Sequence, residues 1–150
     1  LFKQPAWVFN RDLFRIPFFG WGLFFTHPVG IDRGTPRAAL NQLVDQGGAL
    51  LRNGRTMVIF PEGTRVAPGE RIKFEPGGSL LAVRTETPVV PVALNAGEFW
   101  PRHSFRKYPG HIKVIIGPAI ESKGLKAREL NAKVESWIHQ TMDKNFGQGS

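Results

Sequence analysis

The sequence predicts an α/β domain with a largely parallel sheet and flanking helices. Short runs rich in β-branched residues alternate along the chain with longer stretches whose apolar residues recur at helical spacing. Such alternation is typical of β-α-β units, in which the strands run parallel. The clearest candidate strands are 56–60, 89–94 and 112–116. With 150 residues, 41% of them hydrophobic, the chain fits a single domain, residues 1–150, with a core of its own.

The first half of the chain has well-marked element boundaries. Trp7–Phe9 and Val29–Ile31 are short apolar runs, and we predict a strand for each. Thr35 is placed to cap a helix that begins at Pro36, where the missing N–H of proline leaves nothing unsatisfied. Gly54 follows the last apolar residues at helical spacing, which favours the end of the helix there.

The second half continues the alternation. Residues 56–60 predict a fully buried strand, because their apolar run is uninterrupted. A loop is expected over 61–75 and a helix over 76–86. Pro91 lies inside the next apolar run, which favours an edge strand, a bulge or the start of a strand. One apolar face predicts a final amphipathic helix, and its residues are Leu130, Val134, Trp137, Ile138 and Met142.

Composition limits the classes of partner and site. The formal charge is +8, which favours anionic partners: nucleic acid, phosphorylated metabolites or anionic lipid. The chain has no cysteine, so disulfides, thiolate metal sites and a cysteine nucleophile are excluded. No segment has the roughly 18–20 consecutive apolar residues that span a bilayer. Because the chain begins at Leu1 rather than Met, we expect it to start partway through a larger protein.

Polar and charged residues follow several of the predicted strands. Phe60–Arg65 follows one strand, and Ile31–Arg33 includes the end of another. Carboxyl ends of parallel strands meet at one edge of a sheet, so Arg33, Arg65 and Lys73 are predicted to converge on one phosphate. The planar fork of arginine suits phosphate, because it donates two parallel hydrogen bonds. The simpler alternatives are solvated arginines, a plain turn and a local Asp–Arg ion pair of little energetic value.

The order of these segments resembles the phospholipid/glycerol acyltransferase family, typified by 1-acylglycerol-3-phosphate acyltransferase. The matching blocks are Ile31–Arg33, Phe60–Arg65 and Val89–Val92. The resemblance implies a glycerol-3-phosphate-acyltransferase-like fold and an enzyme of phospholipid synthesis at the cytoplasmic face of a membrane. It also implies transfer of a fatty acyl group from acyl-CoA or acyl-carrier protein to a lysophosphatidate-like acceptor. The substrate-binding residues that it implies are Arg33, Glu62, Gly63, Thr64, Arg65 and Lys73.

The first block of that family, Asn-His followed by four residues and an Asp, is absent from this chain. In the family its histidine is the general base on the acceptor hydroxyl. His27 and Asp32 have the same spacing, but no Asn precedes His27, and Asp32 belongs to the Ile31–Arg33 block. We therefore assign no catalytic residue, treat the chain as N-terminally truncated and expect it to be inactive by itself. His139 is expected to pack half-buried, and no metal or cofactor is expected.

Two aromatic segments allow more than one interpretation. Phe99–Tyr108 interleaves bases with aromatics, a pattern suited to nucleic acid, to a membrane interface or to a solvated loop with one or two buried rings. The resemblance favours a membrane or acyl-carrier surface and no nucleic acid. The run 14–25 is either core or a greasy wall near the acyl chain. The alternative function is a non-catalytic basic α/β module that binds nucleic acid or anionic lipid.

Overall fold

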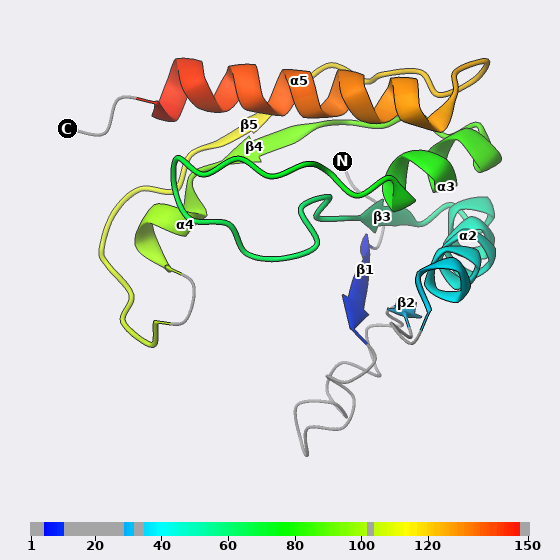
Figure 1. Cartoon of the computed structure of the whole chain (residues 1–150), viewed down its shortest axis with the longest axis horizontal. Coiled ribbons are helices and arrows are strands. Elements are labelled where there is room, and N and C mark those ends of the chain that lie inside the picture. Colours follow the sequence, from blue (N-terminus) through cyan, green and yellow to red (C-terminus); the bar gives the residue numbers. More distant parts are fainter. Residues whose placement is uncertain (1–4, 11–28, 32–34, 102–103, 148–150) are drawn as a thin grey trace. The chain divides into compact units, whose positions relative to one another are not determined.

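The structure is a computed structural model that describes residues 5–10, 29–31, 35–101 and 104–147. The chain divides into two compact units, Leu1–Ile59 and Phe60–Ser150. Figure 1 shows the helices and strands of both. Within the described ranges, no helix is both long and apolar enough to cross a bilayer. The aromatic run 14–25 lies outside these ranges.

The first unit contains a three-stranded parallel sheet. β1 (Pro5–Asn10) lies in the middle, with β2 (Val29–Ile31) on one side and β3 (Thr56–Val58) on the other. Both pairings are parallel. α2 (Pro36–Arg52) connects β2 to β3 and contacts both strands. The two strands run parallel on either side of β1, and a connection between parallel strands needs such a crossover helix. The strands predicted at 7–9 and 29–31, the helix that begins at Pro36 and the parallel direction of the strands are confirmed for this unit.

The ends of α2 follow from its sequence, with one correction. The helix begins at Pro36 as predicted, and Thr35 holds the extended backbone of an N-cap with φ −135°. The Thr35 side chain makes no capping hydrogen bond, however, so the start of the helix depends on the fixed backbone angle of Pro36 and not on a cap by Thr35. At the other end, Gly54 has φ +74°, a left-handed conformation that glycine adopts without steric cost and that suits a chain leaving a helix.

The second unit corrects the prediction of one largely parallel sheet. β4 (Val92–Leu94) and β5 (Val114–Ile116) pair antiparallel, with Val92 opposite Ile116. They are joined by a short helix, α4 (Ala96–Phe99), and a long loop, not by a crossover helix. Antiparallel strands need no crossover, so this connection suits its pairing. The α/β class is confirmed, whereas among the described residues parallel pairing occurs only in the first unit.

The strands are shorter than the apolar runs predicted. β4 starts directly after Pro91, which confirms the strand start as one of the alternatives, and Val89 makes only an isolated bridge to Ile120. β3 ends at Val58 and its residues are half-buried, so the fully buried strand expected over 56–60 is wrong. Phe60 is largely exposed because the chain has already left the sheet there.

The core of the second unit lies between two helices and the segments around them. α3 (Gly77–Thr85) packs on α5 (Ala127–Phe146), and α5 also contacts β4 (Figure 1). The buried residues of this core are Phe74, Ala82, Leu130 and Val134. Leu130 is completely buried, which confirms the predicted apolar face of the final helix.

Candidate functional site

The Phe60–Arg65 motif forms a tight turn just after β3. The backbone N–H of Gly63 donates a hydrogen bond to the carbonyl oxygen of Phe60 at 3.1 Å. Gly63 has φ +66°, and a Cβ placed there would lie 3.5 Å from Cγ of Glu75. There is room for a side chain, so the requirement for glycine is conformational rather than steric. The turn presents Thr64 and Arg65 to solvent, while Glu62 is half-buried.

The loop that begins with this turn is closed at its base. The N–H of Glu75 donates to the carbonyl oxygen of Pro61 at 2.8 Å, which joins the two ends of the predicted 61–75 loop. A second turn inside it has Gly69 at φ +82°. Lys73 lies close in sequence to this closure and is exposed. The closure therefore holds Glu62, Arg65 and Lys73 on one loop with a fixed base.

Phe74 anchors the loop to α5. Its side chain is only 4% exposed, and its ring meets the ring of His139 edge-on, with centroids 5.3 Å apart. Its backbone carbonyl accepts a hydrogen bond from Nδ2 of Asn131 at 3.1 Å, and its N–H donates to Oε2 of Glu135 at 3.4 Å. Phe74, which follows Lys73 in the sequence, is thus held by its ring, its N–H and its carbonyl oxygen. The predicted half-buried packing role of His139 is confirmed.

These contacts belong to a polar stripe on α5, which we define as Asn131, Glu135, His139 and Asp143. Its members are four residues apart, so they lie on one side of the helix. Asp143 forms an ion pair with Arg71 of the loop. Oδ1 of Asn131 accepts a hydrogen bond from the Ser79 hydroxyl at 3.0 Å. The stripe was not predicted from the sequence, although four polar residues spaced four apart beside the apolar face indicate it.

The structure places some predicted site residues and leaves others outside its range. Glu62, Gly63, Thr64, Arg65 and Lys73 share one loop of the second unit. Within the described part of the chain, neither Arg65 nor Lys73 takes part in an ion pair. Two cations without a carboxylate partner on one closed loop can bind an anion.

Three residues of the sequence analysis lie outside the described ranges: His27, Asp32 and Arg33. The convergence of Arg33 with Arg65, and the rejection of His27 with Asp32 as a catalytic pair, therefore stay predictions. Over the ranges that are described, no group of three His, Asp or Glu side chains could hold a metal ion.

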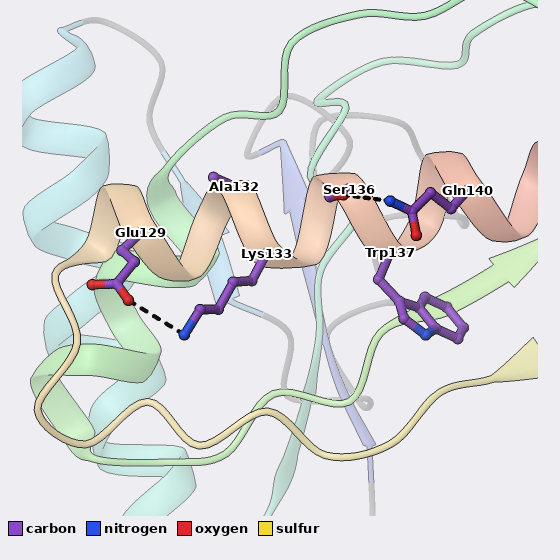
Figure 2. Close-up of a pocket in the computed structure, with 6 residues that line it drawn as sticks. All are labelled: Glu129, Ala132, Lys133, Ser136, Trp137 and Gln140. Carbon is purple, nitrogen blue, oxygen red and sulfur yellow. Dashed lines mark hydrogen bonds and ion pairs between the residues drawn. The ribbon is translucent and has the colours of Figure 1, made fainter.

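A separate hollow of about 460 Å³ lies on α5, and no residue of the 61–75 loop lines it (Figure 2). Figure 2 shows its polar side chains paired along the helix: Glu129 with Lys133 at 3.3 Å, and Gln140 with Ser136 at 3.0 Å. All six lining residues come from this one helix. Because its polar groups already have partners and only one element lines it, the hollow offers little to a ligand.

Comparison with known proteins decides the family. Residues 2–95 match the family model described as acyltransferase. The chain belongs to the acyltransferase family. The match contains the segments singled out above, from Ile31–Arg33 through Phe60–Arg65 to Val89–Val92. The resemblance stated from those motifs is therefore confirmed.

Individual relatives are similar over nearly the whole chain. A 1-acyl-sn-glycerol-3-phosphate acyltransferase from Pseudomonas aeruginosa is 46% identical over 144 residues, which cover 94% of this chain and 56% of the relative. The human 1-acyl-sn-glycerol-3-phosphate acyltransferase beta is 30% identical, over 83% of this chain and 48% of the relative. The chain thus spans about half the length of the curated relatives it matches.

A solved structure shows the same fold. The 1-acyl-sn-glycerophosphate (LPA) acyltransferase PlsC from Thermotoga maritima superposes with a TM-score of 0.79 and 26% identity. The superposition covers 98% of this chain and 59% of that one. The acyltransferase-like fold expected from the motifs is confirmed, and these comparisons give no support to a non-catalytic nucleic-acid-binding module.

Proposed function

We propose that the protein containing this chain transfers a fatty acyl group from a thioester donor to the free hydroxyl of a 1-acylglycerol 3-phosphate. The observation that carries the proposal is the closed 61–75 loop, with Arg65 and Lys73 exposed, in a member of the acyltransferase family. The relatives described above are named for that reaction. The donor is acyl-CoA or acyl-carrier protein, and the product is a diacylated phosphate of phospholipid synthesis.

The acceptor site is assigned to the loop. Arg65 and Lys73 hold the acceptor phosphate, and Arg65 supplies the two-pronged donor set that a phosphate fits. A contribution of Arg33 stays a prediction from the sequence. Glu62 and Thr64 shape the glycerol subsite by hydrogen bonding. Gly63 allows the backbone of the turn to approach the ligand, because no side chain projects from it. The α5 stripe keeps this loop in place through its contacts with Phe74.

The reaction needs one bond made and one broken. The acceptor hydroxyl oxygen attacks the thioester carbonyl carbon, an ester C–O bond forms, and the C–S bond breaks. The hydroxyl proton passes to a general base and then to the departing thiolate. By resemblance to the family, that base is a histidine of the Asn-His block, which this chain does not contain. The chain's own residues bind and orient the acceptor.

The place of action is the cytoplasmic face of a membrane. The acceptor and the product are lipids, and the +8 charge of these 150 residues suits an anionic lipid surface. A donor thioester on an acyl-carrier protein would also bring an acidic partner to a basic surface.

Acceptor selectivity in the intact protein tests the proposal. We expect thiol release from acyl-CoA when 1-acylglycerol 3-phosphate is supplied, and much less with 1-acylglycerol, which lacks the phosphate but keeps the hydroxyl. The product should be identified as the diacylated phosphate. Thiol release that does not depend on an acceptor would indicate a thioesterase. Equal rates with both acceptors would remove the phosphate role from Arg65 and Lys73.

A further inference from the structure

Large apolar side chains are exposed on the loop that joins α4 to β5, which we call the 100–113 loop. Phe105 is fully exposed, Trp100 and Tyr108 are each about half exposed, and Ile112 is 55% exposed. Exposed apolar groups gathered on one segment mark an interaction surface more often than single scattered ones do. The described part of this loop therefore has the composition of a docking surface.

The Lys, Arg, Asp and Glu residues of this segment have one sign of charge. Between Glu98 and Glu121 the sequence contains four Lys and Arg residues and no Asp or Glu. Arg106, Lys107 and Lys113 are exposed in the structure. A segment that combines bases with aromatics and contains no Asp or Glu complements an anionic partner.

The loop is held in shape at its base. The N–H of Tyr108 donates to the carbonyl oxygen of Phe99 at 2.8 Å, and the N–H of Lys113 donates to Oδ1 of Asn95 at 2.8 Å. Gly110 packs directly on the Phe99 ring, where any side chain would collide. Figure 1 shows the loop as a long excursion between α4 and β5. A partner therefore meets side chains that are already partly ordered, which lowers the entropic cost of binding.

Within the loop, a base and an aromatic form one unit. Nζ of Lys107 lies 4.4 Å from the centre of the Trp100 ring, a cation–π contact. Tryptophan beside lysine is suited to the headgroup region of a bilayer, where the ring enters the apolar boundary and the ammonium meets phosphate. The aliphatic side chain of Ile112 also fits lipid, whereas it cannot stack on a nucleic-acid base.

We propose that the 100–113 loop docks on an anionic phospholipid bilayer, with Phe105 entering the interface and Arg106, Lys107 and Lys113 facing lipid phosphates. The inference goes beyond the proposed reaction and does not depend on it. Binding to vesicles can be measured without turnover, so a failure of docking and a failure of acyl transfer are distinguishable.

A local probe tests the docking directly. This chain has no cysteine, so Phe105→Cys can carry an environment-sensitive fluorophore in an intact protein freed of any cysteine elsewhere. The matched control is Ala132→Cys, on the exposed side of α5. We expect a blue shift of the probe at 105 on equimolar phosphatidylcholine–phosphatidylglycerol vesicles, a much smaller one on phosphatidylcholine alone, and none at 132.

Charge variants test the electrostatic part. The double variant Arg106→Gln/Lys107→Gln should weaken the probe's vesicle response about 25-fold, since each base near the surface is worth roughly a factor of five. Lys126→Gln/Arg128→Gln removes the same charge from exposed positions at the start of α5 and should change the response less than about twofold.

The probe variant Phe105→Cys should fold normally, because the Phe105 side chain is fully exposed and packs against nothing in the described part of the fold.

Three results would overturn the proposal. The first is an unshifted probe at 105 on anionic vesicles to which the intact protein is bound. The second is a random oligonucleotide that shifts the probe more strongly than the vesicles do, which would assign the loop to nucleic acid. The third is a blue shift that grows with protein concentration in the absence of vesicles, which would assign the loop to a second copy of the chain.

Discussion

Two arginines of the 61–75 loop have different surroundings and therefore different expected roles. Arg71 forms an ion pair with Asp143, whereas Arg65 has no ion pair within the described part of the chain. Both are exposed, so the Arg71 pair is screened by water and contributes little to stability. The fork of Arg65 remains available to a ligand. The two residues allow one substitution to be compared in two environments.

We predict that Arg65→Lys is not conservative. Lysine keeps the charge but loses the two parallel donors, and a charge-assisted hydrogen bond is worth about 1.5–3 kcal/mol. The loss corresponds to roughly ten- to a hundred-fold in kcat/KM for the acceptor. The KM for the acyl donor should stay nearly unchanged, and Arg71→Lys is the matched control in the same loop. Intact acceptor kinetics, or a loss confined to the donor, would move Arg65 out of the phosphate site.

We predict that Gly63→Ala destabilises the turn without a clash. An alanine at φ +66° costs roughly 1–2 kcal/mol, although its Cβ would meet only Glu75 Cγ at 3.5 Å. Gly97→Ala is the control: it lies in α4, its φ is not in the left-handed region, and its nearest neighbour would be 3.7 Å away. Thermal melts should show a drop of a few degrees for Gly63→Ala alone. Equal Tm values for both variants would mean that the left-handed turn contributes no measurable stability.

At the level of elements, α5 supports the motif loop from a distant part of the sequence. Asn131 lies 57 residues after Phe74, and its amide group accepts from Ser79 and donates to the Phe74 carbonyl. One side chain thus joins the end of the loop, the first turn of α3 and the last helix. The stripe therefore helps to position the 61–75 loop, although none of its members belongs to a recognisable motif.

We predict that Asn131→Asp destabilises the second unit. The change keeps the acceptor for Ser79 but removes the donor to the Phe74 carbonyl, and it brings a carboxylate against that oxygen. A lost bond at a part-buried site costs about 1–3 kcal/mol, which urea unfolding can measure. Asn145→Asp is the control, because its amide also donates to a carbonyl, that of Thr141, on an exposed stretch of α5. Similar losses in both variants would show that the hydrogen bond from Asn131 to Phe74 stabilises the unit no more than an exposed one does.

The elements also show which parts of the fold could be predicted from the sequence. Pro36, Gly54 and Pro91 marked boundaries correctly, because proline and glycine act on the local backbone. The motif residues were likewise found from local sequence. The direction of the β4–β5 pairing was wrong, because a three-residue strand has no local feature that fixes its partner's direction. Contacts between the loop and α5 depend on residues far apart, and no single segment reveals them.

At the level of the whole molecule, charge acts over two distances. The +8 charge of these 150 residues attracts an anionic surface across the solvent, whereas Arg65 would bind one phosphate in direct contact. Salt separates these effects, since the Debye length falls from about 10 Å at 0.1 M to about 3 Å at 1 M. Attraction across several ångströms of water is then lost, while a hydrogen-bonded contact is weakened much less.

We therefore predict that salt lowers the turnover of an acceptor in a membrane more than the turnover of a soluble acceptor. Raising the ionic strength from about 0.1 M to about 1 M should lower the turnover of acceptor embedded in anionic vesicles at least tenfold. Turnover of a short-chain acceptor below its micelle concentration should change only about two- to threefold. The Arg106→Gln/Lys107→Gln variant should show a smaller salt effect on vesicles, because it has fewer bases to screen. Equal salt effects on both acceptors would mean that the positive charge serves the phosphate site itself, and the 100–113 loop would then have no electrostatic part in reaching the membrane.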